Sequence, residues 1–186
     1  MIGINYVGDD PGELSGCWND VLNMKKYIMD VHGFAEENIT ILMDDGEHTE
    51  PTHANIINAY KTVVAQSEED DAIFLHYSGH GTKLRDDDND EADGYDEALV
   101  PRDFQSNGMI RDDDLYDILI KACPDGVHMV SLMDCCHSGA SPKPLVAILF
   151  YRSIATQQQH ARLCFWQVPS WTSLTSLRET EAPAPR

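Results

Sequence analysis

The chain has 186 residues, and 42% of them are apolar, which is enough to bury the core of one domain. Its 13 Lys+Arg and 32 Asp+Glu give a formal net charge of −19, which excludes nucleic acid as a partner and favours cations. We see no apolar run long enough to span a membrane and no secretory signal, so we expect a cytoplasmic protein that makes no membrane contact.

The negative charge is concentrated in residues 1–142. This part has 8 Lys+Arg against 30 Asp+Glu, a net of −22, whereas residues 143–186 have 5 against 2, a net of +3. The densest window is 85–97, where 8 of 13 residues are acidic. We therefore expect a folded domain over residues 1–142 and a different, partly disordered tail over residues 143–186.

Short strand patterns alternate with amphipathic helical patterns along the chain. In order, they predict a strand at 2–6, a helix at 17–32 closed by Gly33, a strand at 39–43, a helix begun by Thr52, a buried strand at 72–77, a helix begun by Asp112 and a strand at 128–133. This alternation indicates an α/β fold with a mostly parallel central sheet and helices on both faces. Residues 146–152 are expected as a strand or a helical turn, and the sheet is expected to keep an exposed edge.

Two polar segments follow predicted strands, YSGHG at 77–81 and DCCHSG at 134–139. The carboxyl ends of parallel strands meet at one edge of a sheet, which is where chemistry is usually placed. Cys136 at the expected start of a helix would have a stabilised thiolate, and His80 between two glycines could approach it as a base. The N–H groups of Gly81 and Cys136 are candidate donors to an oxyanion. These segments predict a cysteine nucleophile with a histidine base.

With GCWND at 16–20, the same segments resemble the hallmark sequences of the metacaspases, which are caspase-like cysteine peptidases. The resemblance covers residues 1–140 and implies a caspase-like three-layer sandwich. The first strand is shortened at Met1, and after Gly139 the family's usual continuation is not recognisable, so the resemblance implies a fold that is incomplete on its C-terminal side.

The resemblance assigns roles by position. It makes His80 the general base and acid and Cys136 the nucleophile of an acyl-enzyme mechanism. Cys135 is the alternative nucleophile, but the family pattern places the nucleophile two residues after the aspartate. The family's primary pocket is acidic and takes Arg or Lys before the scissile bond; the matching residues are Asp20, Ser78 and Asp134. For Asp20 alone, a solvated acid on a helix is the alternative interpretation.

GYDEALVP at 94–101 and RDDDL at 111–115 resemble the family's calcium-binding segments. The resemblance assigns Asp96, Asp112 and Asp113 to a Ca²⁺ site, and carboxylate oxygens suit this ion. A further family ligand is missing near Lys143, so we expect weak affinity for Ca²⁺.

The function that the resemblance implies is a calcium-stimulated cysteine endopeptidase that cleaves protein or peptide substrates after Arg or Lys. The alternative is a weakly active or inactive module that binds calcium or partner proteins, or that a complementing chain completes.

Overall fold

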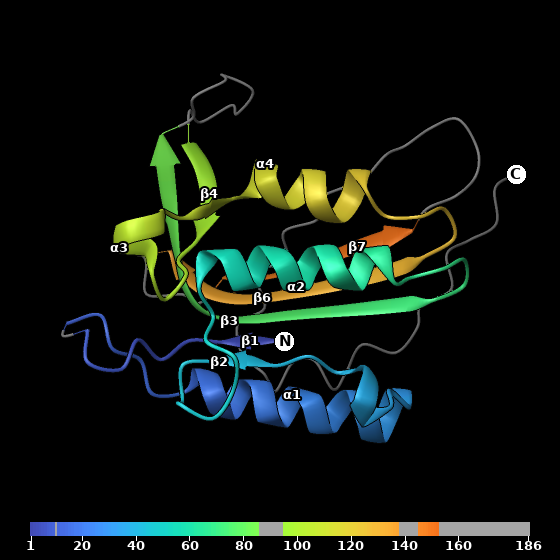
Figure 1. The fold of residues 1–186 in the computed structure, drawn as a ribbon, viewed down its shortest axis with the longest axis horizontal. Coiled ribbons are helices and arrows are strands. Elements are labelled where there is room, and N and C mark those ends of the chain that lie inside the picture. The colour runs from blue at the N-terminus through green and yellow to red at the C-terminus, as the bar shows by residue number, and fades with distance from the viewer. Residues whose placement is uncertain (10, 86–94, 138–144, 153–186) are drawn as a thin grey trace, which may run out of the picture.

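A central sheet with helices on both faces organises the chain (Figure 1). The structure, a computed structural model, describes residues 1–9, 11–85, 95–137 and 145–152. Within these residues seven strands form one sheet in the order β2-β1-β3-β4-β5, with β6 beside β3 and β7 beside β6. The strands are β1 (Ile2–Gly3), β2 (Leu42–Met43), β3 (Ala72–Arg85), β4 (Tyr95–Leu99), β5 (Ile110–Arg111), β6 (His128–His137) and β7 (Leu145–Arg152).

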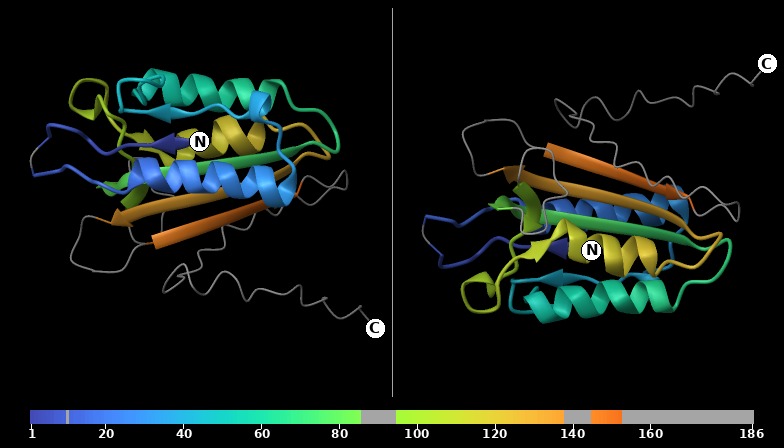
Figure 2. Two further views of the ribbon diagram at one scale, coloured as in Figure 1. Left: turned by 90° about the horizontal axis from the view of Figure 1, so that it is seen from below. Right: turned by 90° about the horizontal axis from the view of Figure 1, so that it is seen from above.

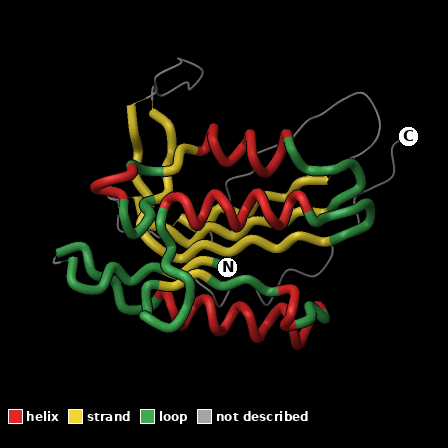
Figure 3. The backbone as a smooth tube through the Cα atoms, viewed as in Figure 1, coloured by secondary structure: helices red, strands yellow, loops and turns green. Residues whose placement is uncertain are grey.

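The neighbouring strands β2, β1, β3 and β6 pair in parallel, and antiparallel pairing adds β4, β5 and β7. Helix α1 (Cys17–His32) covers one face, while α2 (His53–Ala65), α4 (Asp112–Leu115) and the π-helical turn η2 (Tyr116–Lys121) lie on the other (Figure 2). The short helices η1 (Glu36–Asn38) and α3 (Phe104–Asn107) lie in connections (Figure 3). The predicted three-layer α/β fold is confirmed. Within the described residues, no helix has the length and apolarity needed to cross a bilayer.

Strand β3 is buried on both faces, which explains its continuous apolar sequence. Leu75 and Tyr77 belong to the larger core cluster, which includes Ile56 and Val64 of α2. Phe74 packs instead against the smaller cluster on the α1 side, whose buried members are Met24, Ile28 and Leu132. Alternate residues of one strand thus connect the two helical layers.

Two of the three predicted helix boundaries are confirmed. Gly33 ends α1 with a φ of 74°, a left-handed conformation that glycine adopts without steric cost. Thr52 begins α2, and its side chain accepts a hydrogen bond from the Asn55 N–H at 3.3 Å. The prediction that Asp112 caps a helix is wrong: Arg111 precedes the first turn, and Asp112 is the first helical residue.

The ends of the central strands differ from the prediction. Segments 77–81 and 134–139 were expected as loops, but β3 continues to Arg85 and β6 to His137. Apolar side chains stop at Tyr77 and Met133, whereas parallel pairing continues to Gly81 with His137, because backbone pairing does not require apolar side chains. The expectation that Cys136 begins a helix is therefore wrong. Residues 138 and 139 lie outside the described residues.

Residues 146–152 were expected as a strand or a helical turn, and the structure has a strand there. Residues 145–152 form strand β7, which pairs antiparallel with β6 from Cys135 with Leu145 to His128 with Arg152. Strand β6 is therefore paired on both sides, and β7 has no partner on its other side among the described residues, so the sheet keeps an unpaired edge, as expected. Of the tail, only residues 145–152 are described, so the expectation of a partly disordered tail over residues 143–186 lies otherwise outside the described residues.

Strand β1 is shorter than the predicted strand at 2–6. The Ile4 N–H still binds the Ser78 carbonyl at 2.9 Å, but Tyr6 has a φ of 54°, which turns the chain out of the sheet. The N–H groups of Asn5 and Tyr6 donate to the carboxylate of Asp44, 2.9 and 2.7 Å away, instead of to a strand. A side chain from a distant loop thus decides where β1 ends.

His76 is a fully buried histidine in the middle of β3. Neither ring nitrogen has a hydrogen-bond partner, and burial, with a smaller effect of the N-terminal positive charge, lowers its pKa to about 4. In the unfolded chain the pKa is 6.5, so the unfolded state binds the proton more readily, and acidification favours unfolding between pH 6.5 and 4.

We predict that His76→Leu removes this acid sensitivity. On lowering the pH from 7 to 5, the wild type should lose about 2 kcal/mol more of its unfolding free energy than the variant, as measured by urea denaturation. His128→Leu is the matched control, because His128 lies on an exposed position of β6. Equal pH dependence of the wild type and His76→Leu would contradict the prediction.

Candidate active site

The parallel register of β3 and β6 places the two motifs side by side. Ser78 pairs with Asp134, Gly79 with Cys135 and His80 with Cys136. Adjacent strands lie about 4.8 Å apart, so the backbones of His80 and Cys136 are immediate neighbours. The side chain of Cys136 lies outside the described part of the chain. The register itself brings the expected base and the expected nucleophile to one place in the sheet.

The His80 ring is held by a backbone acceptor and by an aromatic ring. Its Nε2 lies 2.7 Å from the Gly12 carbonyl oxygen, and its ring centroid is 4.6 Å from that of Tyr6. A carbonyl oxygen can only accept a hydrogen bond, so Nε2 carries the proton and donates. In the neutral ring, Nδ1 is then the nitrogen that can take a proton.

The backbone of His80 is fixed as firmly as its ring. Its N–H donates to the Tyr6 hydroxyl at 2.9 Å, and its carbonyl accepts from the Tyr77 hydroxyl at 2.8 Å. A Cβ at Gly79 would lie 2.9 Å from the Tyr77 hydroxyl and 3.1 Å from the Tyr6 hydroxyl. Glycine is therefore required at 79 for both hydroxyls to approach. Gly81, the expected oxyanion donor, is buried in β3 between its partners Leu99 and His137.

The structure brings Asp20, Ser78 and Asp134 together beside this pair of strands. The buried Ser78 hydroxyl donates to Asp20 Oδ2 at 3.0 Å, and Ser78 is the register partner of Asp134. Burial and, to a smaller extent, the charge of Asp20 raise the pKa of Asp134. Among the described residues no lysine or arginine pairs with Asp20 or Asp134. Two neighbouring carboxylates without a cation form a site that favours a positively charged group.

Cys17 belongs to the same group, although its sequence position gave it no role. It is buried at the start of α1, and burial raises the pKa of its thiol, with further increases from the charges of Asp20 and Asp134. A neutral thiol among carboxylates lines this site without adding charge. The only signal in the sequence was its place in the GCWND segment at 16–20.

A second carboxylate group lies between β4 and α4. One oxygen each of Asp96, Asp112 and Asp113 lie within 4.8 Å of one another. Asp96 is 1% exposed; its Oδ2 binds the Arg111 guanidinium, while its Oδ1 has no hydrogen-bond partner among the described residues. Burial, followed by the charge of Glu97, raises the pKa of Asp112 to about 6. A buried carboxylate oxygen without a partner is costly, so this arrangement fits a bound cation.

Comparison with known proteins defines the family. Residues 1–142 match the family described as metacaspase, peptidase C14 domain. Metacaspase III c of Phaeodactylum tricornutum is 70% identical over 140 residues, which are 75% of this chain and 42% of that protein. Metacaspase-1 of Eremothecium gossypii is 46% identical over 144 residues, 76% of this chain and 31% of that protein. A crystal structure of a Geobacter sulfurreducens protein is similar with a TM-score of 0.58 and 33% identity, covering 75% of this chain and 50% of that chain.

The chain therefore belongs to the metacaspase family. It spans 42% and 31% of the lengths of the two curated relatives.

Proposed function

We propose that the chain is a cysteine endopeptidase with Cys136 as nucleophile and His80 as general base and acid. The observation that carries the proposal is the pairing of His80 with Cys136 across β3 and β6, together with the His80 Nε2 contact to the Gly12 carbonyl. Membership of a peptidase family supports the same class of reaction. The hydrogen bond between His80 Nε2 and the Gly12 carbonyl holds the ring and leaves Nδ1 as the nitrogen that can act as the base.

The reaction proceeds in two halves. Nδ1 of His80 takes the thiol proton of Cys136, and the thiolate attacks the scissile carbonyl carbon. N–H groups of Gly81 and Cys136 stabilise the oxyanion, and the protonated His80 then gives its proton to the leaving amine as the C–N bond breaks. Water, deprotonated by His80, attacks the thioester, and the carboxylic acid product leaves as the thiol regains its proton.

The acidic site formed by Asp20, Ser78 and Asp134 selects Arg or Lys before the scissile bond. A guanidinium or ammonium group is attracted by the two carboxylates, and a carboxylate side chain is repelled. The hydrogen bond from Ser78 to Asp20 fixes one of the two acids in place. Substrates are thus protein or peptide segments with a basic residue at this position.

We predict that Cys136→Ala lowers kcat/KM for a fluorogenic peptide ending in Arg by at least about 10³-fold, because no nucleophile remains. Cys135→Ala is the matched control and should stay within about threefold of the wild type. The assay compares peptides ending in Arg and in Asp, with millimolar Ca²⁺. Loss of activity in Cys135→Ala alone would contradict the nucleophile, and cleavage only after Asp would contradict the acidic pocket.

Calcium is the proposed activator, held by Asp96, Asp112 and Asp113. The unpartnered, buried Oδ1 of Asp96 supports this assignment, and oxygen-only ligands suit Ca²⁺. The site belongs to the same β-hairpin as His80, because Asp96 pairs with Leu84 across β3 and β4. Bound Ca²⁺ would neutralise the crowded carboxylates and so stabilise this hairpin.

We predict that Asp113→Asn weakens Ca²⁺ binding at least about tenfold in isothermal titration calorimetry, because a charged ligand is lost. Asp113 is exposed, so the substitution spares the core. Asp114→Asn is the control, since this exposed neighbour lies outside the carboxylate group. Equal affinities of both variants and the wild type would contradict the site. Calcium binding without turnover in the wild type would instead favour a non-catalytic, calcium-binding module.

A further inference from the structure

We propose that Asp44 is a positioning residue for His80, acting through the loop that follows β1. This inference rests on the proposed role of His80 as the base. Within the described residues, Asp44 makes no hydrogen bond or ion pair with His80, Asp20, Ser78 or Asp134; it binds the backbone that carries Tyr6 and leads to Gly12. Those two residues are the ones that contact the His80 ring.

The Asp44 carboxylate is buried and collects donors from two parts of the chain. Its side chain is 2% exposed, directly after β2. It accepts hydrogen bonds from the N–H groups of Asn5 and Tyr6 at 2.9 and 2.7 Å, and from the Trp18 indole at 2.7 Å. Charge-assisted bonds of this kind are about twice as strong as neutral ones. The first turn of α1 and the loop after β1 are therefore tied to one anion.

Tyr6 needs such an anchor because its backbone is strained. Its φ of 54° is unfavourable for a residue with a bulky side chain. This conformation directs the side chain so that its ring lies against His80, and its hydroxyl accepts the His80 N–H and donates to the Val100 carbonyl at 2.7 Å. Without the Asp44 bond to the Tyr6 N–H, the extended conformation predicted from the sequence would be favoured.

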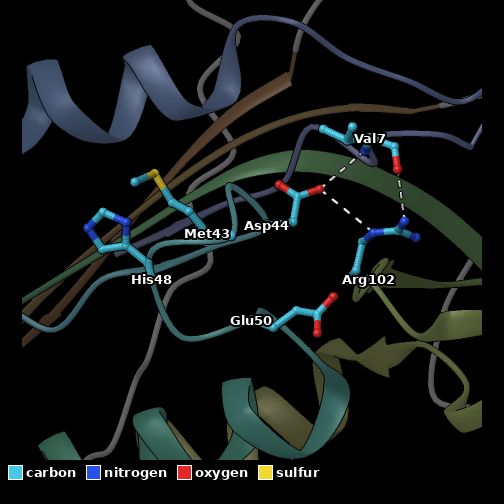
Figure 4. A pocket seen from close by; sticks show the side chains of 7 residues that line it. Val7, Met43, Asp44, His48, Glu50 and Arg102 are labelled. Carbon is cyan, nitrogen blue, oxygen red and sulfur yellow. Dashed lines mark hydrogen bonds and ion pairs between the residues drawn. The ribbon is translucent and has the colours of Figure 1, made fainter.

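Arg102 binds the same loop after β1 and also lies near Asp44. It donates to Asp9 Oδ2 at 2.5 Å and to the Val7 carbonyl at 2.9 Å, and its Nε lies 3.8 Å from Asp44 Oδ2. Figure 4 shows the Asp44 carboxylate beside Val7 and Arg102, with dashed lines to the Val7 N–H and to the Arg102 guanidinium. The Asp9 carbonyl in turn accepts from the Gly12 N–H at 2.5 Å. The contacts of Arg102 thus lead through Asp9 to Gly12, whose carbonyl accepts the hydrogen bond from His80 Nε2.

An amide cannot replace this carboxylate. Asparagine at 44 would offer one oxygen and one NH₂ group, which would face backbone N–H donors that cannot accept. Asp44→Asn should therefore release the loop while leaving the side chain volume nearly unchanged. The matched control is Asp45→Asn: within the part of the chain that the structure describes, Asp45 forms hydrogen bonds with its own loop, through His48 and the Glu47 N–H.

The experiment measures two properties of the full chain. Steady-state kinetics with the Arg-ending peptide should show kcat lowered about 10- to 100-fold in Asp44→Asn with KM within about twofold, because the base is misplaced while Asp20 stays held by the hydrogen bond from Ser78. Nitrogen-15 NMR of the histidine rings, with His80 assigned by comparison with His80→Gln, should show the Nε2-protonated tautomer in the wild type and a mixture in Asp44→Asn. Asp45→Asn should match the wild type in both.

Several outcomes would overturn the inference. A wild-type kcat and a wild-type His80 tautomer in Asp44→Asn would do so, as would an increase in KM alone. If circular dichroism shows that Asp44→Asn does not fold, Arg102→Gln takes its place, with the same direction expected in both readouts and at least about a threefold loss of kcat. If even the wild type cleaves no peptide, the proposed function fails, but the NMR comparison still decides whether Asp44 positions the ring.

Discussion

Ten residues of β3 pair in parallel with ten residues of β6, from Ala72 with His128 to Gly81 with His137, and the geometry of the site depends on this register. A shift by one residue would exchange the faces of every side chain and would separate His80 from Cys136 as partners. The register is fixed by burial, because Ile73, Leu75 and Tyr77 must lie in the core with Met129 and Met133. The apolar half of each strand thus sets the position of the polar half.

The high negative charge of residues 1–142 separates into carboxylates with different surroundings. Asp44 is buried and satisfied by backbone and indole donors, so it is part of the structure. Asp96 is buried with one oxygen on Arg111 and one oxygen without a partner, which fits a cation. Asp20 and Asp134 have no cationic partner among the described residues, and burial, with a smaller effect of the Asp20 charge, raises the pKa of Asp134. Net charge alone could not separate a structural anion from a binding site.

Helix ends could be predicted from the sequence, whereas contacts between residues far apart in the sequence could not. Gly33 and Thr52 mark helix ends because their own backbone or side chain makes the cap. The polar segment around His80 was expected to follow the strand at 72–77, but the pairing with β6 keeps it extended as part of β3. Tyr6 was predicted in a strand, and its left-handed conformation depends on Asp44, which lies 38 residues away.

The same contrast holds for the candidate site. The motif residues could be selected by resemblance, because side chains of that type at that spacing are specific. The Gly12 carbonyl leaves no signal in a sequence, because every residue has one, and Asp44 within the pair at 44–45 is indistinguishable from a solvated loop acid. Sequence motifs therefore identify the reacting side chains of the site, whereas the contacts made by the Gly12 carbonyl and by Asp44 become visible only in the fold.

The most direct measurement is covalent labelling by a peptidyl chloromethyl ketone that ends in Arg, followed by peptide mass spectrometry. A base and a nucleophile joined by the β3–β6 register should give a single adduct on Cys136 in the wild type, and His80→Ala should abolish this adduct. An adduct on Cys135, or equal labelling of Cys136 without His80, would contradict the assignment of these two residues as the reacting pair.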